Sequence, residues 1–102
     1  MTNCIFCKIN NGEIPSKKVY ENDLVFAIND INPRAPKHIL VIPKNHIENF
    51  TDLVDENIAR ALYDAIKEIV KQENIVDYKL QINNGSKAGQ EVMHLHIHIL
   101  GY

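Results

Sequence analysis

The C-terminal segment of this chain places a histidine at every second position, His94, His96 and His98, with aliphatic residues between them. An extended strand sends successive side chains to opposite faces, whereas a helix would scatter these residues around its axis. The spacing therefore predicts a strand within residues 89–102 that carries the three imidazoles on one face. The other face would carry Met93, Leu95, Ile97 and Ile99.

A row of titratable rings is a poor choice for an ordinary solvent-facing surface, because strands favour β-branched and aromatic residues. The alternative is a sheet whose polar face happens to carry histidine. Neutral imidazole is a nucleophile near pH 7, and a second imidazole can deliver a proton to a leaving group. One catalytic zinc ion bound by all three rings is disfavoured, because neighbouring rings would lie roughly 6.5–7 Å apart on a straight strand. We therefore expect no catalytic metal.

The bulk properties restrict the class of protein. A chain of 102 residues with 45% apolar and 24% charged residues predicts a single soluble globular domain over residues 1–102. A formal net charge of −2 argues against nucleic-acid binding. No apolar run approaches the ~20 residues of a membrane span, so no membrane association is expected. The N-terminus lacks the pattern of a secretory signal, so we expect a cytoplasmic location.

Local patterns predict the remaining elements. Residues 4–11 carry a short apolar stripe at helical spacing, and residues 52–73 carry a long one. Two prolines make residues 30–36 a loop. Four further segments have patterns typical of strands: residues 17–21, 24–29, 38–42 and 78–83. The sequence thus predicts an α+β domain with an antiparallel sheet of about five strands, one main helix and one short N-terminal helix.

The long helix should lie with its apolar face on the sheet, since no second helix of comparable length is expected. Its N-cap candidates are Thr51, Asp52 and Asp55. The predicted apolar face consists of Ile58, Ala61, Leu62, Ala65, Ile66, Ile69 and Val70.

The histidine segment fits the His-φ-His-φ-His-φ-φ signature, in which φ is apolar, and so resembles the histidine triad (HIT) superfamily, specifically its Hint branch of nucleotide-binding proteins. Residues 94–100 carry the signature. Matching motifs lie in the expected order along essentially the whole chain, at residues 4–9, 13–15, 30–33, 35–38 and 41–44, at Asn83, and at residues 85–86 and 89–90. The resemblance implies a HIT-like fold and a homodimer in which two protomers form one continuous ten-stranded sheet.

The resemblance also implies a catalytic group made of His94, His96, His98 and His38. In the family the middle histidine, matched by His96, attacks the α-phosphorus and forms a nucleotidyl-histidine intermediate that water resolves. His98 would contact phosphate oxygens, and His38 would assist proton transfer or orient the row. The alternative for His38 is a polar residue that only begins a strand. The implied activity is that of a phosphoramidase-like hydrolase of purine nucleoside monophosphate conjugates.

Nucleotide binding is implied by matches elsewhere in the chain. The base would lie among Ile5, Phe6, Ile9, Ile28 and Ile31, although each of these is equally compatible with the core. Asp30 would bind the ribose hydroxyls, unless it only caps a turn. The phosphate would lie near Asn83, Gly89, Gln90, Glu91, His96 and His98.

Cys4 and Cys7 have the spacing of zinc ligands, and His46 and His94 would complete a tetrahedral Cys₂His₂ site. Some bacterial proteins of the Hint branch carry such a zinc. We therefore expect a structural zinc ion, which would tie the N-terminal helix to the sheet. The alternative is a pair of thiols, with or without redox chemistry.

The chain departs from the Hint pattern in two places. Glu91 stands where such proteins usually have a small hydroxyl residue, and a carboxylate there would repel a phosphate unless it points away. The sequence ends at Tyr102, where many relatives continue with a tail that helps to shape the pocket. Two other functions therefore stay open: a dinucleoside polyphosphate hydrolase, and a nucleotide-binding regulatory module without catalysis.

Overall fold

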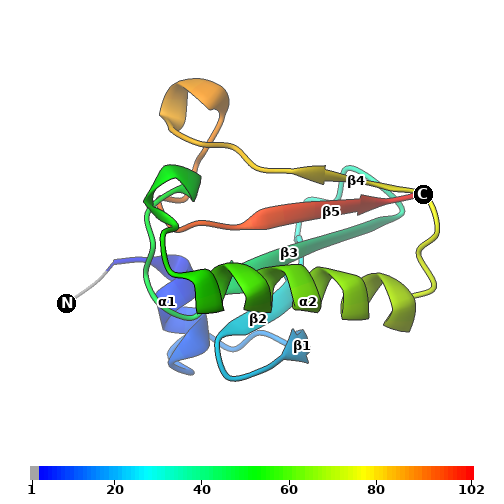
Figure 1. Ribbon diagram of the computed structural model, residues 1–102, viewed down its shortest axis with the longest axis horizontal. Helices are drawn as coiled ribbons and strands as arrows, with labels where there is room; N and C mark the ends of the chain where they lie inside the picture. The colour runs from blue at the N-terminus through cyan, green and yellow to red at the C-terminus, as the bar shows by residue number, and fades with distance from the viewer. Residues whose placement is uncertain (1–2) are drawn as a thin grey trace.

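The computed structural model describes residues 3–102. The strands of this part of the chain form one five-stranded antiparallel sheet (Figure 1). The strand order is β1-β2-β3-β5-β4, and every neighbouring pair is antiparallel. The fold class predicted from the sequence is therefore confirmed. The strands are β1 (Lys18–Glu21), β2 (Val25–Asn29), β3 (Lys37–Pro43), β4 (Tyr78–Gln81) and β5 (Ile97–Gly101).

The main helix, α2 (Glu56–Gln72), lies across one face of the sheet (Figure 1). Asp55 is its N-cap, and the Asp55 carboxylate accepts hydrogen bonds from the backbone N–H groups of Asn57 and Ile58. The helix begins later than expected, because residues 50–52 form a separate 3₁₀ turn capped by Asn49. The residues that α2 buries against the sheet are Ile58, Leu62, Ala65, Ile66 and Ile69.

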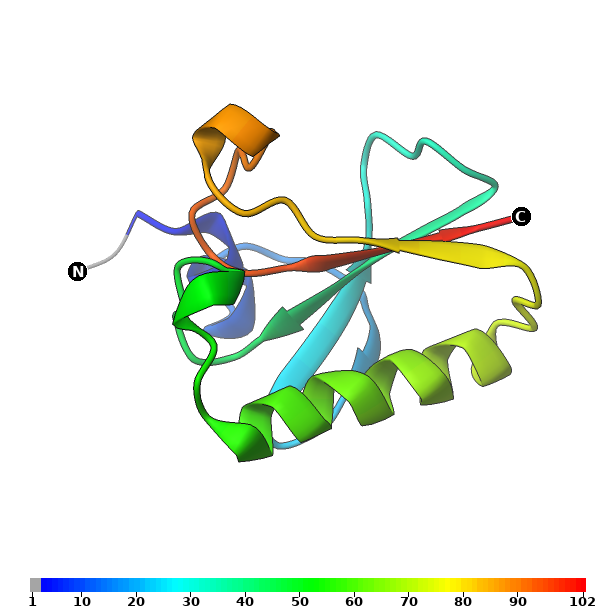
Figure 2. The same cartoon turned by 45° about the horizontal axis from the view of Figure 1, so that its top comes forward.

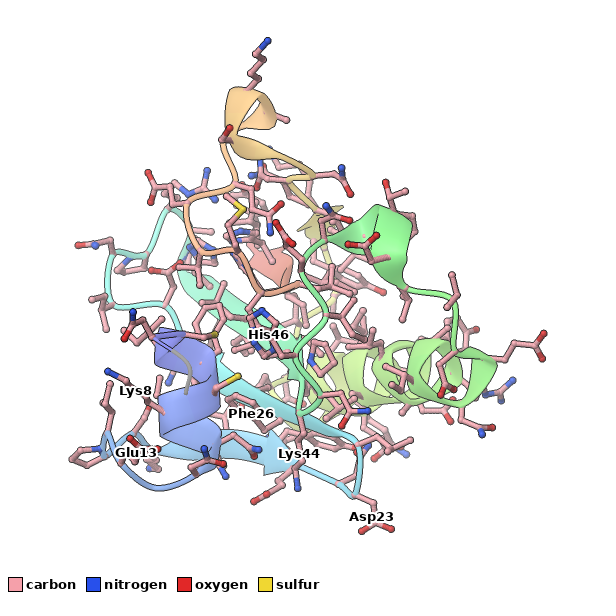
Figure 3. The ribbon with its side chains drawn as sticks, turned by 90° about the vertical axis from the view of Figure 1, so that its left-hand side faces the viewer. Lys8, Glu13, Asp23, Phe26, Lys44 and His46 are labelled. Carbon is pink, nitrogen blue, oxygen red and sulfur yellow. The ribbon has the colours of Figure 1, made fainter. Side chains whose placement is uncertain are left out.

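The short helix α1 (Ile5–Asn10) lies on the opposite side of the sheet from α2 (Figure 3). The Cys4 thiol caps it by accepting a hydrogen bond from the backbone N–H of Cys7, at 3.4 Å. Phe6 and Ile9 pack from α1 onto strand side chains and form a second, smaller core. Both faces of the sheet are thus covered, and α1 leaves room beside it for a cavity.

The histidine strand is shorter than predicted. β5 begins only at Ile97. Ile97 pairs with Val41 of β3, and the pairing of the two strands ends there. Pro43 ends β3 and has no N–H for the ladder, and the N–H of Leu95 bonds instead to the carbonyl of Ile47, at 2.7 Å. His94 and His96 therefore lie in the segment that precedes the strand.

The predicted alternation nevertheless continues through this segment. Leu95, Ile97 and Ile99 belong to the core beneath α2, whereas the histidines alternate with them. Met93 is the exception, because 37% of it is exposed and it does not join that core. The prediction was therefore right about the two faces from Leu95 onward and wrong about where the strand begins.

Two connections between strands, the one after β2 and the one after β4, have defined conformations. The loop between β2 and β3 lies on the side of the sheet away from α2 (Figure 2). The predicted strand at 78–83 ends at Gln81, and a short 3₁₀ helix at Ser86–Ala88 follows between Gly85 and Gly89, which both have positive φ. Across residues 3–102, no helix has the length and apolarity needed to cross a membrane.

Candidate active site

A cavity of about 790 Å³ opens on the α1 side of the sheet. Three parts of the chain meet there: α1, the C-terminal end of β2 with the loop that follows, and the segment from Asn83 to the histidines. Most of the residues expected to bind the nucleotide line it. They are Ile5, Phe6, Ile9, Ile28, Asp30, Ile31, Asn83, Gly89, Glu91, His96 and His98.

His96 is held in one tautomer by the backbone. Its Nδ1 lies 2.8 Å from the carbonyl oxygen of His94, which can only accept, so Nδ1 carries the proton. In the neutral ring, the lone pair is therefore on Nε2. The ring packs edge-on against Phe6, with centroids 5.1 Å apart, and against His98, at 5.0 Å. This is the tautomer that a nucleophilic histidine requires.

His38 and His98 form a hydrogen-bonded pair whose direction is also set by the backbone. The N–H of Arg34 donates to His38 Nδ1, at 3.1 Å, so the proton of His38 is on Nε2. That proton is donated to His98 Nδ1, at 2.9 Å, which leaves the proton of His98 on its own Nε2. His98 therefore faces the cavity as a donor.

Both members of this pair are buried, and burial is the main cause of their altered acidity. Only 3% of His38 and 8% of His98 is exposed. Burial, reinforced by the charges of His96, His38 and Arg34, lowers the pKa of His98 to about 4. Burial also lowers the pKa of His38, although the nearby Asp30 carboxylate partly opposes this. Both rings are therefore neutral at pH 7. A neutral His98 that donates its Nε2 proton must take up another proton, because it would otherwise become an anion.

Asp30 has two contacts at the mouth of the cavity. One carboxylate oxygen accepts from the backbone N–H of Asn32, at 2.8 Å, and so closes a turn. The other lies 3.4 Å from Nε2 of His38. The turn-capping interpretation is therefore correct, and Asp30 also lines the cavity.

The sequence left open whether the apolar residues belong to the core or line a binding site, and the structure shows that some of them do both. Phe6, Ile9 and Ile28 are buried in the smaller core and also line the cavity. Ile5 and Ile31, by contrast, are 44% and 91% exposed. The wall therefore has a buried inner part and an exposed rim.

Gln90 is the one expected nucleotide-binding residue that does not line the cavity. Its side chain is 3% exposed and holds the neighbouring loop together. The amide oxygen accepts from the N–H of Gly85, and the amide nitrogen donates to the carbonyls of Glu48 and Val92, at 2.7, 2.7 and 3.0 Å respectively. Gln90 therefore positions the segment that leads to the histidines.

The expected zinc ligands come together at the N-terminal end of the histidine row. The ligand atoms of Cys4, Cys7, His46 and His94 all lie within 4.8 Å of one another. His94 Nδ1 is 3.1 Å from the sulfur of Cys4 and 3.6 Å from that of Cys7, and His46 Nδ1 is 3.4 Å from Cys7. His46 belongs to the segment that follows β3, and Figure 3 shows it on the side of that segment that faces α1.

These separations fit a zinc ion, because tetrahedral bonds of about 2.3 Å to sulfur and 2.0–2.1 Å to nitrogen put the two ligand atoms about 3.5 Å apart. The tautomer of His94 fits as well. Its Nε2 donates to the carbonyl of Pro43, at 2.8 Å, so the lone pair of Nδ1 faces the thiols.

The structure adds residues to the cavity that the sequence did not single out. Arg34, Ile14 and Val92 line it, and the Arg34 guanidinium lies 3.5 Å from His98 Nδ1. Arg34 belongs to the double-proline loop, where no side-chain periodicity indicates which residue points inward. Its position next to the motif at residues 35–38 was the only available signal.

Comparisons with known proteins agree with the fold and the histidine pattern. A model of the HIT domain matches residues 11–102, and the chain belongs to this family. It is 48% identical over 99 residues to an uncharacterized HIT-like protein from Methanocaldococcus jannaschii, which covers 95% of this chain and 77% of that protein. It is 44% identical over 104 residues to the protein HitA of Neisseria gonorrhoeae, with coverage of 99% and 97%.

Solved structures give the same result. A histidine triad protein from Clostridium difficile matches with a TM-score of 0.92 and 48% identity, covering 100% of this chain and 92% of that chain. A HIT family hydrolase from Legionella pneumophila matches with a TM-score of 0.91 and 41% identity, covering 97% and 92%. The resemblance to the histidine triad superfamily is therefore confirmed.

Proposed function

We propose that this protein hydrolyses purine nucleoside monophosphate conjugates, in the manner of a phosphoramidase, through a covalent nucleotidyl-His96 intermediate. The observation that carries the proposal is the tautomer of His96. Its Nδ1–H is bonded to the carbonyl of His94, so Nε2 bears the lone pair in a cavity lined by Asp30 and apolar side chains. The similarity to a HIT family hydrolase from Legionella pneumophila supports hydrolysis as the general reaction.

The reaction would proceed in two steps. In the first, Nε2 of His96 attacks the α-phosphorus and the bond from phosphorus to the leaving nitrogen breaks. That nitrogen takes the Nε2 proton of His98, and a proton from solvent replaces it, so that His98 stays neutral. In the second, a water oxygen attacks the same phosphorus, and its proton passes through His98 to solvent. The bond from phosphorus to His96 breaks, and the nucleoside monophosphate leaves.

His38 would act through His98 rather than on the substrate. It donates to His98 Nδ1 and so keeps the proton of His98 on Nε2, where the leaving nitrogen would need it. The base would lie along Phe6, Ile9 and Ile28, with the ribose at Asp30. Asn83 and the backbone around Gly89 would donate to the non-bridging oxygens as charge develops on them.

The test is turnover of an AMP-amine conjugate and of a dinucleoside polyphosphate by the wild type and by His96→Ala. We expect the conjugate to be hydrolysed and the activity to vanish in the variant. Faster turnover of the dinucleotide would favour the dinucleoside polyphosphate hydrolase. Binding of AMP without any turnover would leave a regulatory module and contradict the proposed chemistry.

We also propose that Cys4, Cys7, His46 and His94 bind one structural zinc ion. The ligand separations and the tautomer of His94 support this. Protein purified without added metal should contain close to one zinc per chain, and a Cys4→Ser, Cys7→Ser double variant should contain none. Wild-type protein without zinc, with a melting temperature equal to that of the double variant, would refute the site.

The homodimer is a further proposal. β4 is an edge strand of the sheet, and its Tyr78 and Leu80 are 36% and 51% exposed. Pairing of this edge with a second copy would cover apolar side chains and satisfy the outer backbone groups. Sedimentation analysis should give a dimer for the wild type and a monomer for Leu80→Lys. A monomeric wild type would contradict the proposal.

A further inference from the structure

The charges that line the cavity are unevenly distributed. Within residues 3–102, Arg34 is the only lysine or arginine in the lining, whereas Asp30 and Glu91 both contribute carboxylates. A phosphate ligand carries at least one negative charge. Without the Arg34 guanidinium, the two carboxylates would repel such a ligand.

The buried pair His38 and His98 cannot provide this positive charge at pH 7. Burial lowers the pKa of His98 to about 4 and lowers that of His38 as well, so both rings are neutral donors. A neutral N–H donor bonds a phosphate oxygen less strongly than a charged one. The cavity therefore needs a permanent cation beside the pair, and a guanidinium keeps its charge at any working pH.

The position of Arg34 suits this task. Its Nη2 lies 3.5 Å from His98 Nδ1, which already accepts from His38 at 2.9 Å, so the guanidinium contact is the longer and weaker of the two. A guanidinium has five N–H donors in a planar fork that matches phosphate geometry. The side chain is exposed along the cavity mouth, so the remaining donors can turn toward a ligand.

We infer that Arg34 binds the anionic phosphate of the ligand and thereby makes the cavity select nucleotides over nucleosides. The inference rests on the proposed function, since it requires a nucleoside phosphate in this cavity. The backbone N–H of Arg34 fixes the tautomer of His38, and the side chain neutralises the phosphate beside His98. One residue thus contributes to the site in two separate ways, and a side-chain substitution removes only the second.

The test compares binding of AMP with binding of adenosine, which lacks the phosphate, by isothermal titration calorimetry. Arg34→Gln keeps the backbone N–H and should raise the Kd of AMP about 10-fold. The Kd of adenosine should stay within about twofold of the wild type, because no charge is lost against an uncharged ligand. Arg34→Lys should recover part of the affinity, since a point charge is kept but the planar fork is not.

Arg60→Gln is the matched control, because Arg60 is the other arginine of the chain and lies exposed on α2, away from the cavity. It should change neither Kd. Raising the salt concentration should weaken AMP binding to the wild type and to Arg60→Gln more than to Arg34→Gln.

The inference is overturned if Arg34→Gln binds AMP as tightly as the wild type. It is also overturned if the variant loses AMP and adenosine equally, because the side chain would then only shape the cavity. A wild type that binds both ligands with equal affinity removes the role of Arg34 but leaves the nucleoside site. A wild type that binds neither refutes the proposed function and the inference together.

Discussion

The two ends of the histidine row carry the same side chain in different surroundings. At one end, His94 turns Nδ1 toward the sulfurs of Cys4 and Cys7, at 3.1 and 3.6 Å. At the other end, His98 turns Nδ1 toward His38, at 2.9 Å. Burial lowers the pKa of both rings to about 4. Burial is therefore common to the two sites, and the partner of Nδ1 makes one end suitable for a metal and the other for proton transfer.

His96 lies between these ends and contacts both. Its Nδ1–H is bonded to the carbonyl of His94, and its ring packs against His98 and Phe6. Phe6 also packs edge-on against His94, with centroids 5.7 Å apart. A change at the thiol end would thus reach His96 through α1 and the backbone, whereas a change at the imidazole end would reach it through the ring contact with His98.

Removal of zinc should distinguish the two ends most strongly. Zinc would tie α1 to the sheet, so zinc-loaded protein should be more stable than chelated protein by about 4 kcal/mol when free zinc exceeds its Kd 1,000-fold. Urea unfolding with and without a chelator measures the difference. The Cys4→Ser, Cys7→Ser double variant is the control and should unfold identically under both conditions. An equal stability of the wild type in both would contradict the assignment.

Loss of the proton donor should affect catalysis and spare the metal. His98→Ala should lower kcat for the AMP-amine conjugate about 100-fold, the usual contribution of a positioned acid, with zinc content unchanged. His46→Ala should give the opposite pattern, with zinc lost and the proton donor still in place. Equal damage to kcat and zinc content in both variants would show that the two ends are not separate.

Acid should destabilise the fold through the imidazole end. The pKa of His98 is 6.5 in the unfolded reference and about 4 in the folded protein. Between these pH values the unfolded chain binds one more proton, so the free energy of unfolding falls by about 1.4 kcal/mol for each pH unit of acidification. Above 6.5 neither state binds this proton, and below about 4 both do, so the effect is confined to this window.

Urea unfolding of chelated protein across this pH range measures the effect, and the chelator removes any metal-dependent contribution. His98→Gln lacks the titrating group, so its stability should depend less steeply on pH by the same amount. The same slope in both proteins would mean that His98 is not held neutral by the fold.

The smallest expected effect concerns Glu91, which lines the cavity and is exposed. Glu91→Ser removes a carboxylate near the phosphate site and should raise kcat/KM for the AMP-amine conjugate about threefold at low salt, with a smaller gain at high salt. Glu68→Ser, on the exposed side of α2, is the matched control. A fall in kcat/KM in Glu91→Ser would show that the carboxylate assists catalysis.

Much of the fold was predictable because its elements have local signatures. The apolar period of α2 and the prolines of the loop after β2 gave the right elements, with ends that shifted by a few residues. The beginning of β5 was not predictable from its own residues. It depends on Pro43 of the neighbouring strand, which ends the ladder, and on Ile47, which takes over the N–H of Leu95.

The sequence by itself determined which residue types were present for chemistry and which faces they occupy, because alternation along a strand is a property of the local backbone. Only the tertiary structure decided which groups lie beside His94 and His98. Cys4 and His94 are 90 positions apart, and His38 and His98 are 60 apart. Their contacts exist because β3 pairs with β5 and α1 packs on the sheet. The tautomers of His94 and His98 follow from long-range contacts of this kind. Those of His96 and His38 are set by backbone groups two and four residues away.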